Sequence, residues 1–387
     1  MMRRSVLILI ELGFILFIVG ISSGSAEVRV SDIEIVVGQS AALTGPAQAL
    51  GKGMKAGMEV YFKYINAQGG INGRRIRLIS YDDGYEPTRC VDQTRRLIKE
   101  GVFALIGFVG TPTSNVAVPV AQEEKIPYIG PFTGAEFLRN PVKHYVINIR
   151  GSYYDETEGL VKHLVDDLGI QKIACFYQDD SYGRAGLEGV QRALKKRNME
   201  LASEDNYPRN TLAVKGGLMR VKKGNPEAII MIGAYAPCAE FIKLTKEIGM
   251  KGVRFCNVSF VGSAALKEAL GDAGEGVIIS QVVPFPWDKS IPVVEEYHRL
   301  FKEYFPEEEL GFVSLEGFMV AKFFVQAVKA AGPDLTREGL IYAIERKGKF
   351  DLGGITLTFS SQDHQGMDEI HFTVIEEGAF RSITTFK

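Results

Sequence analysis

Two turns in the stretch Val102–Leu138 carry hydroxyl side chains at a spacing that suits the binding of an anion. The stretch opens with Val102–Ile106, a short apolar run bounded by glycines, which is typical of a strand buried on both faces. A turn rich in glycine and proline follows, and Thr113 and Ser114 stand where an apolar stripe at helical spacing begins. A second buried run then leads to another such turn, which carries Thr133.

Two consecutive strand–turn–helix units bring their turns to the carboxyl edge of one parallel sheet, where open α/β sheets bind ligands. Backbone N–H groups at helix N-termini and the helix dipole favour an anion there, and a carboxylate is the simplest candidate. The alternative is that Thr113 and Ser114 only cap a helix, as such residues commonly do. The stretch by itself leaves both interpretations open.

Aromatic residues stand at the predicted ends of other strands and at a predicted crossing between domains, where core packing does not require them. They are Phe132, Tyr153, Tyr154, Tyr182, Tyr235 and Trp287. Any one of them could be an ordinary packed or exposed loop residue. Six at one edge favour a lined pocket for a small molecule, because such pockets are built mainly from apolar and aromatic side chains.

Motifs for cofactors, metals and catalysis are weak or missing. The glycines of Gly51–Ala56 match the dinucleotide fingerprint loosely, but they do not follow a strand directly, as that fingerprint requires. The sequence contains no phosphate-binding loop, nucleophile elbow or HExxH motif, and its five histidines are scattered. Asp82-Asp83 and Asp179-Asp180 could be acid/base or metal pairs, but turn-forming aspartates are far commoner. We therefore predict no cofactor, no metal and no catalytic residue, with an exported hydrolase using Asp179 or Asp180 as the weaker alternative.

The N-terminus has the pattern of a secretory signal peptide over residues 1–26. Arg3 and Arg4 precede an apolar run, and the small residues Gly24–Ala26 form a cleavage site. This pattern predicts export to the periplasm. An uncleaved segment of this length could instead anchor the protein as a single short span.

Length and charge indicate a two-domain protein that does not bind nucleic acid. A chain of 387 residues suggests two domains at about 150 residues each. The formal net charge is −2, and no basic stripe argues for nucleic acid. The four cysteines show no metal-ligand spacing. An exported protein could bridge Cys238 and Cys256, but buried free thiols are favoured.

The order of the predicted elements indicates an α/β fold with two lobes. Strands and helices alternate from Ile33–Val37 to Val146–Asn148, and the alternation restarts with a helix over Glu156–Asp167. The last third of the chain completes these two lobes instead of forming a third. We predict that lobe 1 comprises residues 27–150 and 286–358 and that lobe 2 comprises residues 151–285 and 359–387.

Five short motifs together are similar to those of one known family. They are ALTGP at Ala42–Pro46, INAQGGING at Ile65–Gly73, YDD at Tyr81–Asp83, GTPT at Gly110–Thr113 and QDDSYGRAGL at Gln178–Leu187. They resemble the periplasmic leucine/isoleucine/valine-binding proteins, the class I solute-binding proteins of branched-chain amino-acid ABC transporters. The resemblance implies the type I periplasmic-binding-protein fold, in which two Rossmann-like lobes joined by three crossings close on a small ligand.

The resemblance also implies which residues meet the ligand. By their positions, and with the aromatic lining included, they are Leu50, Thr113, Ser114, Phe132, Thr133, Gly134, Tyr154, Tyr182, Tyr235, Ser259 and Trp287. Ser259 departs from the family pattern, because it stands near the place of an acidic residue that pairs with the ligand's ammonium group. A serine cannot neutralise a buried ammonium. If the ligand is an amino acid, another acid such as Asp155 or Glu156 has to take that role.

The resulting hypothesis is an exported, monomeric, non-catalytic receptor that clamps a small carboxylate-bearing ligand and passes it to the membrane permease of an ABC importer. The ligand could be an aliphatic amino acid, an aromatic carboxylate or a short amide, and Ser259 favours one without a buried ammonium. Closure would be a hinge motion about crossings near Ile149–Asp155, Gln281–Trp287 and Thr358–Ser361. The alternative is a ligand-sensing module of the same fold that feeds a signalling partner.

Overall fold

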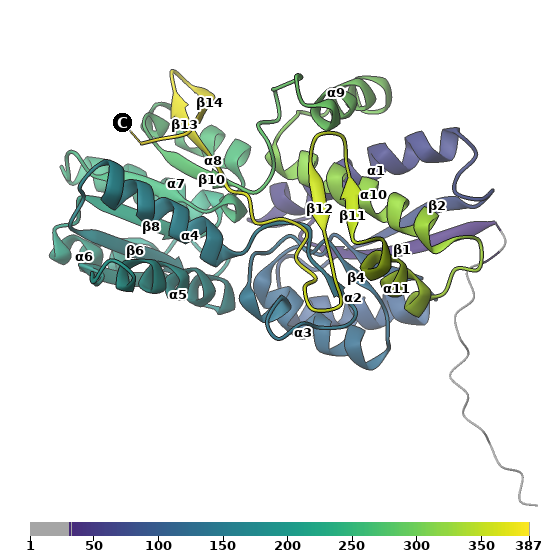
Figure 1. Cartoon of the computed structure of the whole chain (residues 1–387). Coiled ribbons are helices and arrows are strands. Elements are labelled where there is room, and N and C mark those ends of the chain that lie inside the picture. Colours follow the sequence, from purple (N-terminus) through teal and green to yellow (C-terminus); the bar gives the residue numbers. More distant parts are fainter. Residues whose placement is uncertain (1–30, 32, 387) are drawn as a thin grey trace, which may run out of the picture.

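The structure, a computed structural model, describes residue 31 and residues 33–386. These residues form two α/β lobes that lie side by side and are joined by three crossings of the chain (Figure 1). The signal peptide predicted for residues 1–26 lies outside the described residues. None of the helices in the described part of the chain is long and apolar enough to cross a membrane.

Lobe 1 is built from the first part of the chain and from a later segment that ends before the C-terminal strands. Its first part contains β1 (Glu34–Ala41), α1 (Gln48–Ala67), β2 (Arg75–Asp82), α2 (Pro87–Lys99), β3 (Ala104–Ile106), α3 (Thr111–Glu123), β4 (Tyr128–Ile129), η1 (Glu136–Leu138) and β5 (Val146–Ile147). Its later part contains α9 (Pro292–Tyr304), α10 (Phe312–Ala331), α11 (Arg337–Lys347), β11 (Lys349–Asp351) and β12 (Thr356–Thr358).

Lobe 2 is built from the middle of the chain and its end. In order it contains α4 (Tyr153–Lys162), a π turn (His163–Asp167), β6 (Ile173–Gln178), α5 (Ser181–Lys195), β7 (Ser203–Tyr207), α6 (Lys215–Val221), η3 (Lys222–Gly224), β8 (Ala228–Ile232), α7 (Tyr235–Glu247), β9 (Arg254–Asn257), η4 (Ser259–Val261), α8 (Ser263–Leu270), η5 (Gly271–Gly274), β10 (Ile278–Gln281), β13 (His371–Glu376) and β14 (Ala379–Ile383).

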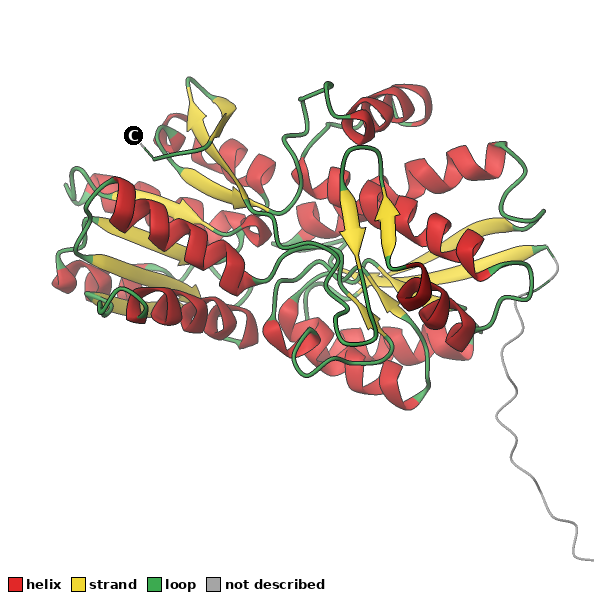
Figure 2. Cartoon of the chain, viewed as in Figure 1, coloured by secondary structure: helices red, strands yellow, loops and turns green. Residues whose placement is uncertain are grey.

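Each lobe has one large sheet with helices on both faces, as the alternating pattern predicted (Figure 2), and β11 and β12 form a separate two-stranded sheet in lobe 1. The sheet of lobe 1 is parallel throughout, in the order β2-β1-β3-β4-β5. The sheet of lobe 2 has the order β14-β13-β10-β9-β8-β6-β7 and is parallel except for β13 and β14. In both sheets the strand order reverses next to the first strand of the lobe, so the carboxyl ends of the strands flank the crevice that such folds use for ligands.

The three crossings lie between β5 and α4, between β10 and α9, and between β12 and β13. The first and third run side by side, because Asn148 N–H donates to His364 O at 2.9 Å and Gly366 N–H donates to Asn148 O at 2.8 Å. Arg139 adds a side-chain link to the first crossing, with one nitrogen 3.0 Å from Arg150 O. Two of the three connections between the lobes are therefore tied together by hydrogen bonds.

Close helix packing explains one difference from the sequence-based expectation. The sequence predicted a loop as far as Gly53, but α1 begins at Gln48 and includes three glycines. A Cβ on Gly51 would lie 1.9 Å from Ala42 O, and one on Gly57 would lie 2.0 Å from Ser314 O. These glycines lower helix propensity but allow α1 to pack directly on β1 and α10, so tertiary packing outweighs propensity.

The sequence analysis also missed the edge strands β7 and β14. The sequence of β7 is SEDNY, and three of the five residues of β14 are exposed. An edge strand with polar or exposed positions lacks the apolar run or clean alternation that identifies a strand from sequence. All four cysteines are buried and unpaired in the described structure, which agrees with the expectation of free thiols.

Replacing Gly57 with alanine tests the direct contact between α1 and α10. Because the added Cβ meets backbone atoms of α10 and not a flexible side chain, we expect the free energy of unfolding to fall by about 1–3 kcal/mol. Gly216→Ala in α6 is a matched control, since its Cβ would approach no atom closer than 3.9 Å. Thermal denaturation of both variants measures the effect, and an equal response of the two would contradict the proposed contact.

Candidate functional site

The interlobe site lies where turns at the carboxyl ends of strands from both sheets meet. Lobe 1 supplies the turns after β2, β3 and β4, and lobe 2 supplies those after β6, β8 and β9. The first crossing and the start of α4 lie between these two sets of turns. The polar, aromatic and charged side chains of the site are almost all inaccessible to solvent.

A pair of threonine hydroxyls marks the lobe 1 side of the site. The Oγ1 atoms of Thr111 and Thr133 are 2.6 Å apart, and the Tyr153 hydroxyl lies 3.4 Å from Thr111 Oγ1. Thr111 is the first residue of α3, so its hydroxyl lies at the positive end of that helix. This arrangement offers hydroxyl donors and a helix N-terminus to one anion.

Thr113 and Ser114, predicted to meet the carboxylate, instead bond within lobe 1. Thr113 Oγ1 donates to Val109 O at 2.6 Å and Gly110 O at 3.0 Å, and Ser114 Oγ accepts from the Tyr128 hydroxyl at 2.9 Å. Neither is the N-cap, which is Gly110. In this turn the hydroxyl that faces Thr133 belongs to Thr111, which the sequence analysis did not select.

An aromatic cluster fills the centre of the site with rings from both lobes. Phe260 of η4 lies with its ring centroid 4.5 Å from Tyr182, 5.3 Å from Phe132 and 5.9 Å from Tyr85. Tyr153 continues the cluster, 5.3 Å from Tyr182. Phe132 and Tyr182, which the sequence analysis selected, thus lie in this cluster, whereas Phe260 and Tyr85 were not singled out.

A charged cluster lies beside these rings, centred on Arg150 of the first crossing. Its guanidinium is fully buried, 3.2 Å from Glu156 of lobe 2 and 3.5 Å from Glu316 of lobe 1, and it also donates to Ser259 Oγ. The guanidinium carbon is 4.9 Å from the centre of the Phe132 ring. The Arg150 Nε atom has no hydrogen-bond partner among the described residues. The cluster thus holds one cation and two carboxylates in a region without solvent.

The two carboxylates differ in how well they are compensated. Glu156 accepts hydrogen bonds from Ser259 N at 2.7 Å and from the hydroxyls of Ser259 and Ser280 at 3.0 and 2.7 Å. Glu316 has only its long contact with Arg150 among the described hydrogen bonds. Burial, which outweighs the attraction of Arg150, and repulsion by Glu156 raise the pKa of Glu316 to about 7.

The acid missing at Ser259 is therefore supplied from elsewhere in the chain. Glu156, one of the two replacements expected from the sequence, places its carboxylate directly against Ser259. Asp155, the other, caps α4 instead, since it accepts a hydrogen bond from Ser152 N at 2.8 Å. The sequence analysis missed Arg150 and Glu316, although a charged residue directly after a buried strand and one within an apolar helix are both unusual signals.

Leu50 and Tyr235, two of the residues predicted to meet the ligand, approach each other at one edge of the site. A Cβ on Gly262 would lie 2.6 Å from Leu50 Cδ2 and 3.6 Å from Tyr235 Cδ1, so all three residues share one contact between the lobes. A cavity of about 320 Å³ lies beside them. Its walls come from α1, from residues 262–265 of lobe 2 and from residues 307–314 before α10 and in its first turn.

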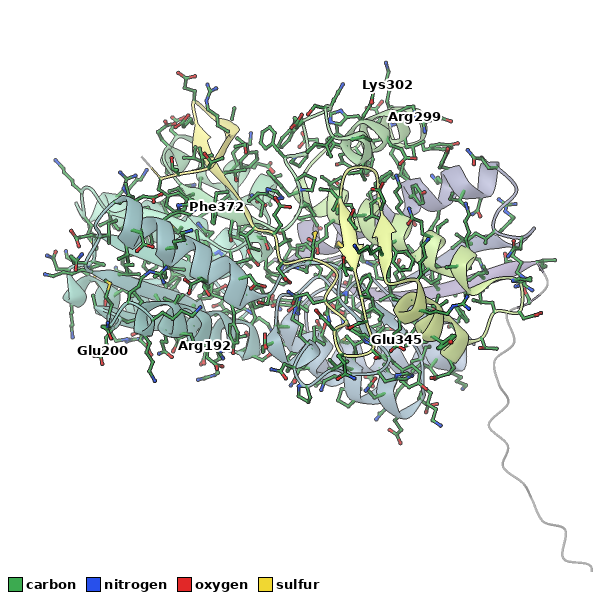
Figure 3. The ribbon with its side chains drawn as sticks, viewed as in Figure 1. Arg192, Glu200, Arg299, Lys302, Glu345 and Phe372 are labelled. Atoms are coloured by element: carbon green, nitrogen blue, oxygen red, sulfur yellow. The ribbon has the colours of Figure 1, made fainter. Side chains whose placement is uncertain are left out.

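Three other predicted residues have different surroundings. Tyr154 lies under Arg192, 4.4 Å from its guanidinium carbon, and Figure 3 shows Arg192 at the outer edge of lobe 2. Trp287 is 39% exposed on the second crossing and stacks on Phe380 at 5.8 Å. Gly134 allows Tyr153 to approach, because a Cβ there would lie 2.6 Å from Tyr153 N. Of these three residues, only Gly134 contributes to the interlobe site, because it allows Tyr153 to approach.

The aspartate pairs Asp82-Asp83 and Asp179-Asp180 lie in turns of the chain, where they accept hydrogen bonds from the backbone. Asp82 Oδ1 accepts from Leu43 N and Gly84 N, while Asp180 Oδ1 accepts from Tyr182 N at the start of α5. Asp179 pairs with Arg184 at 2.6 Å. Among the described residues, no group of three or more histidine, cysteine, aspartate or glutamate side chains is placed to hold a metal ion. These contacts favour the structural interpretation of both pairs.

Replacing Glu316 with glutamine tests the charge arrangement. Because folding raises the pKa of Glu316 from 4.5 to about 7, its stabilising contribution is complete below pH 4.5 and is lost as the pH rises to 7. Glutamine mimics the protonated form at every pH. We expect the variant to gain stability relative to the unaltered protein between pH 5 and pH 8, by up to about 3 kcal/mol. Thermal denaturation at both pH values measures this gain, with Glu188→Gln on exposed α5 as the control, and a pH-independent difference would contradict it.

Comparisons with known proteins agree with this architecture. A sequence model of the periplasmic binding protein family matches residues 34–379. The crystal structure of a possible leucine/isoleucine/valine-binding protein from Rhodopirellula baltica SH 1 is 37% identical, covers 92% of this chain and 98% of that chain, and has a TM-score of 0.88. A substrate-binding periplasmic protein from Ralstonia solanacearum is 29% identical, covers 90% and 100% of the two chains, and has a TM-score of 0.85.

A relative from Escherichia coli is less similar in sequence than these two proteins. The Leu/Ile/Val-binding protein of Escherichia coli strain K12 is 24% identical over 250 residues, which are 65% of this chain and 67% of that protein. The family match spans almost all of the described residues and both lobes. The chain therefore belongs to the periplasmic binding protein family, in the class I type to which the leucine/isoleucine/valine-binding proteins belong.

Proposed function

We propose that the protein is the exported, monomeric receptor of an ABC importer, which binds a small carboxylate-bearing solute between its lobes in the periplasm and passes it to a membrane permease. The observation that carries the proposal is the Thr111–Thr133 hydroxyl pair at the N-terminus of α3, which faces buried residues of the other lobe. The family to which the chain belongs supports the receptor role.

The hydroxyl pair is suited to the ligand's carboxylate. Thr111 and Thr133 supply two hydroxyls, one of which donates to the other in this structure and would have to turn to bind the ligand, and the α3 N-terminus supplies partial positive charge without a neighbouring acid in its first turn. Two arginines lie nearby, but two carboxylates already surround Arg150, and Arg139 donates to backbone carbonyl oxygens, including those of Ala135 and Arg150. The carboxylate therefore fits the threonine side of the site better than the arginine side.

An ammonium group on the ligand would compensate the buried carboxylate that has the fewest partners. Among the described residues, Glu316 has one hydrogen bond, a long one to Arg150, and a buried carboxylate with so little compensation is costly. An ammonium near Glu316 would supply the missing partner. We therefore propose an α-amino acid with an apolar or aromatic side chain, packed against Tyr182 and Phe260, in preference to a non-amino carboxylate.

Binding and closure are coupled in this proposal because the ligand touches both lobes. The division of the lobes at residues 150/151, 285/286 and 358/359 places the hinges within or at the edges of the three crossings. A ligand that contacts both Thr111 of lobe 1 and Tyr182 of lobe 2 stabilises the closed arrangement over an open one.

A thermal-shift screen tests the proposed ligand class. At a hundred times its dissociation constant, a ligand adds about 2.7 kcal/mol of stability, which raises the Tm by a few degrees. We expect a rise with L-leucine or L-phenylalanine. A rise only with non-amino carboxylates would reject the ammonium site, and no rise across amino acids, aromatic acids and amides would reject the receptor proposal.

Substitution of the hydroxyl pair tests the carboxylate position. Thr111→Val and Thr133→Val keep the side-chain shape but remove a donor to a charged group, so each should weaken binding about tenfold or more. Ser114→Ala is the matched control, because its hydroxyl bonds Tyr128 inside lobe 1. Isothermal titration of the ligand found in the screen gives the affinities. Equal affinities for Thr111→Val and the unaltered protein would mean that the ligand's carboxylate does not bind at the threonine pair.

A further inference from the structure

The turn at residues 84–86 of lobe 1 reaches across to lobe 2 at a place far from the crossings. It follows β2, the edge strand farthest from β5, where the first crossing begins. Its partners Arg209 and Asn210 follow β7, the edge strand of lobe 2 farthest from β10 and β13. The contact therefore joins the two sheet edges that no crossing holds together.

Three polar contacts connect the two sides. Arg209 lies 2.8 Å from Glu86 Oε2, and Asn210 Nδ2 donates to Glu86 Oε1 at 2.6 Å and to Gly84 O at 3.2 Å. All described side-chain partners of Glu86 belong to lobe 2. Arg209 is oriented from its own lobe by Asp180, 3.3 Å away.

A buried aromatic contact lies beneath these surface groups. Tyr85 is fully buried, and Gln178 Nε2 of lobe 2 lies 3.3 Å from its hydroxyl. Tyr85 has a φ of 62°, an unfavourable value for a residue with a bulky side chain. Asp83 holds this conformation by accepting a hydrogen bond from Tyr85 N at 2.8 Å, and Gly110 leaves room, since a Cβ there would lie 2.3 Å from the ring.

We propose that these residues form an interlobe clasp, which affects the affinity for the solute without binding the solute's polar groups. The clasp consists of Gly84, Tyr85 and Glu86 of lobe 1 and Gln178, Arg209 and Asn210 of lobe 2. Its polar part exists only when the lobes are closed, because hinge opening separates the two sheet edges first. The inference rests on the closure used in the proposed function and assigns Glu86 and Arg209 as positioning residues.

The clasp acts through the balance between closed and open forms. A ligand that binds only the closed form has an apparent affinity proportional to the fraction of protein that is closed. Glu86→Ala removes the two cross-lobe bonds of its carboxylate, to Arg209 and Asn210, and breaks no described side-chain bond within lobe 1. The closed-to-open ratio should therefore fall by about three- to tenfold, the range expected for a partly exposed charged pair with an added hydrogen bond.

Distance measurements between spin labels test the clasp with and without a ligand. Labels at Asp92→Cys in α2 and Lys195→Cys in α5 report the interlobe distance, and the four native cysteines are buried. Glu86→Ala is compared with Glu34→Ala, which breaks a similar ion pair at 3.0 Å to Arg77 within lobe 1. Each protein is measured alone and with L-leucine, at low and high salt.

We expect the closed-to-open ratio to fall by about three- to tenfold in Glu86→Ala and by less in Glu86→Gln. Glu34→Ala should have the same ratio as the unaltered protein. High salt should reduce the difference, because the pair is partly exposed. Identical distance distributions for Glu86→Ala and the unaltered protein under both conditions would overturn the clasp. Failure of L-leucine to change any distance would count against leucine as the ligand, while the comparison of the free proteins would still decide the clasp.

Discussion

Arg150 lies wholly inside the protein between two carboxylates that belong to different lobes. A buried charge is tolerated only when paired and hydrogen-bonded, so its position constrains everything around it. Arg150 of the first crossing has to point into the protein, and Glu156 of α4 and Glu316 of α10 have to lie next to it. Arg139 supports this placement by binding the carbonyl oxygen of Arg150 itself. The charged cluster thus connects both lobes to the first crossing, one of the proposed hinges.

The remaining site residues complement this cluster in charge and shape. Thr111 and Thr133 offer neutral hydroxyls on the lobe 1 side, while the buried rings of Phe260 and Tyr182 pack in the centre of the site. The departure at Ser259 from the family pattern then has a simple physical meaning. Ser259 does not carry the charge but orients the acid that does, through hydrogen bonds to Glu156 from its backbone N–H and its hydroxyl. The negative charge beside Ser259 comes from Glu156 of α4.

The two lobes approach each other on both sides of this site. Leu50 meets Gly262 and Tyr235 at one edge, and the turn at residues 84–86 meets Arg209 and Asn210 at another. The left-handed conformation of Tyr85 is held by Asp83, which the sequence showed only as part of a turn. A residue of lobe 1 is thus kept in an unfavourable conformation in which it contacts lobe 2, as expected of a site whose geometry serves closure.

The sequence by itself determined the α/β class, the two lobes and most of the helices and central strands, because apolar periodicity and glycine-rich turns are local signals. It also selected Phe132, Thr133, Tyr182 and Ser259, which the structure places between the lobes, since residues after parallel strands share one edge. Only the tertiary structure decided that Thr111 and not Thr113 faces Thr133, and that Tyr153 and not Tyr154 points inward. A shift of one or two residues at a helix start rotates a side chain to another face, which spacing alone does not reveal. The cluster of Arg150, Glu156 and Glu316 joins residues up to 166 positions apart, so its pairing depends on the packed lobes and not on any local pattern.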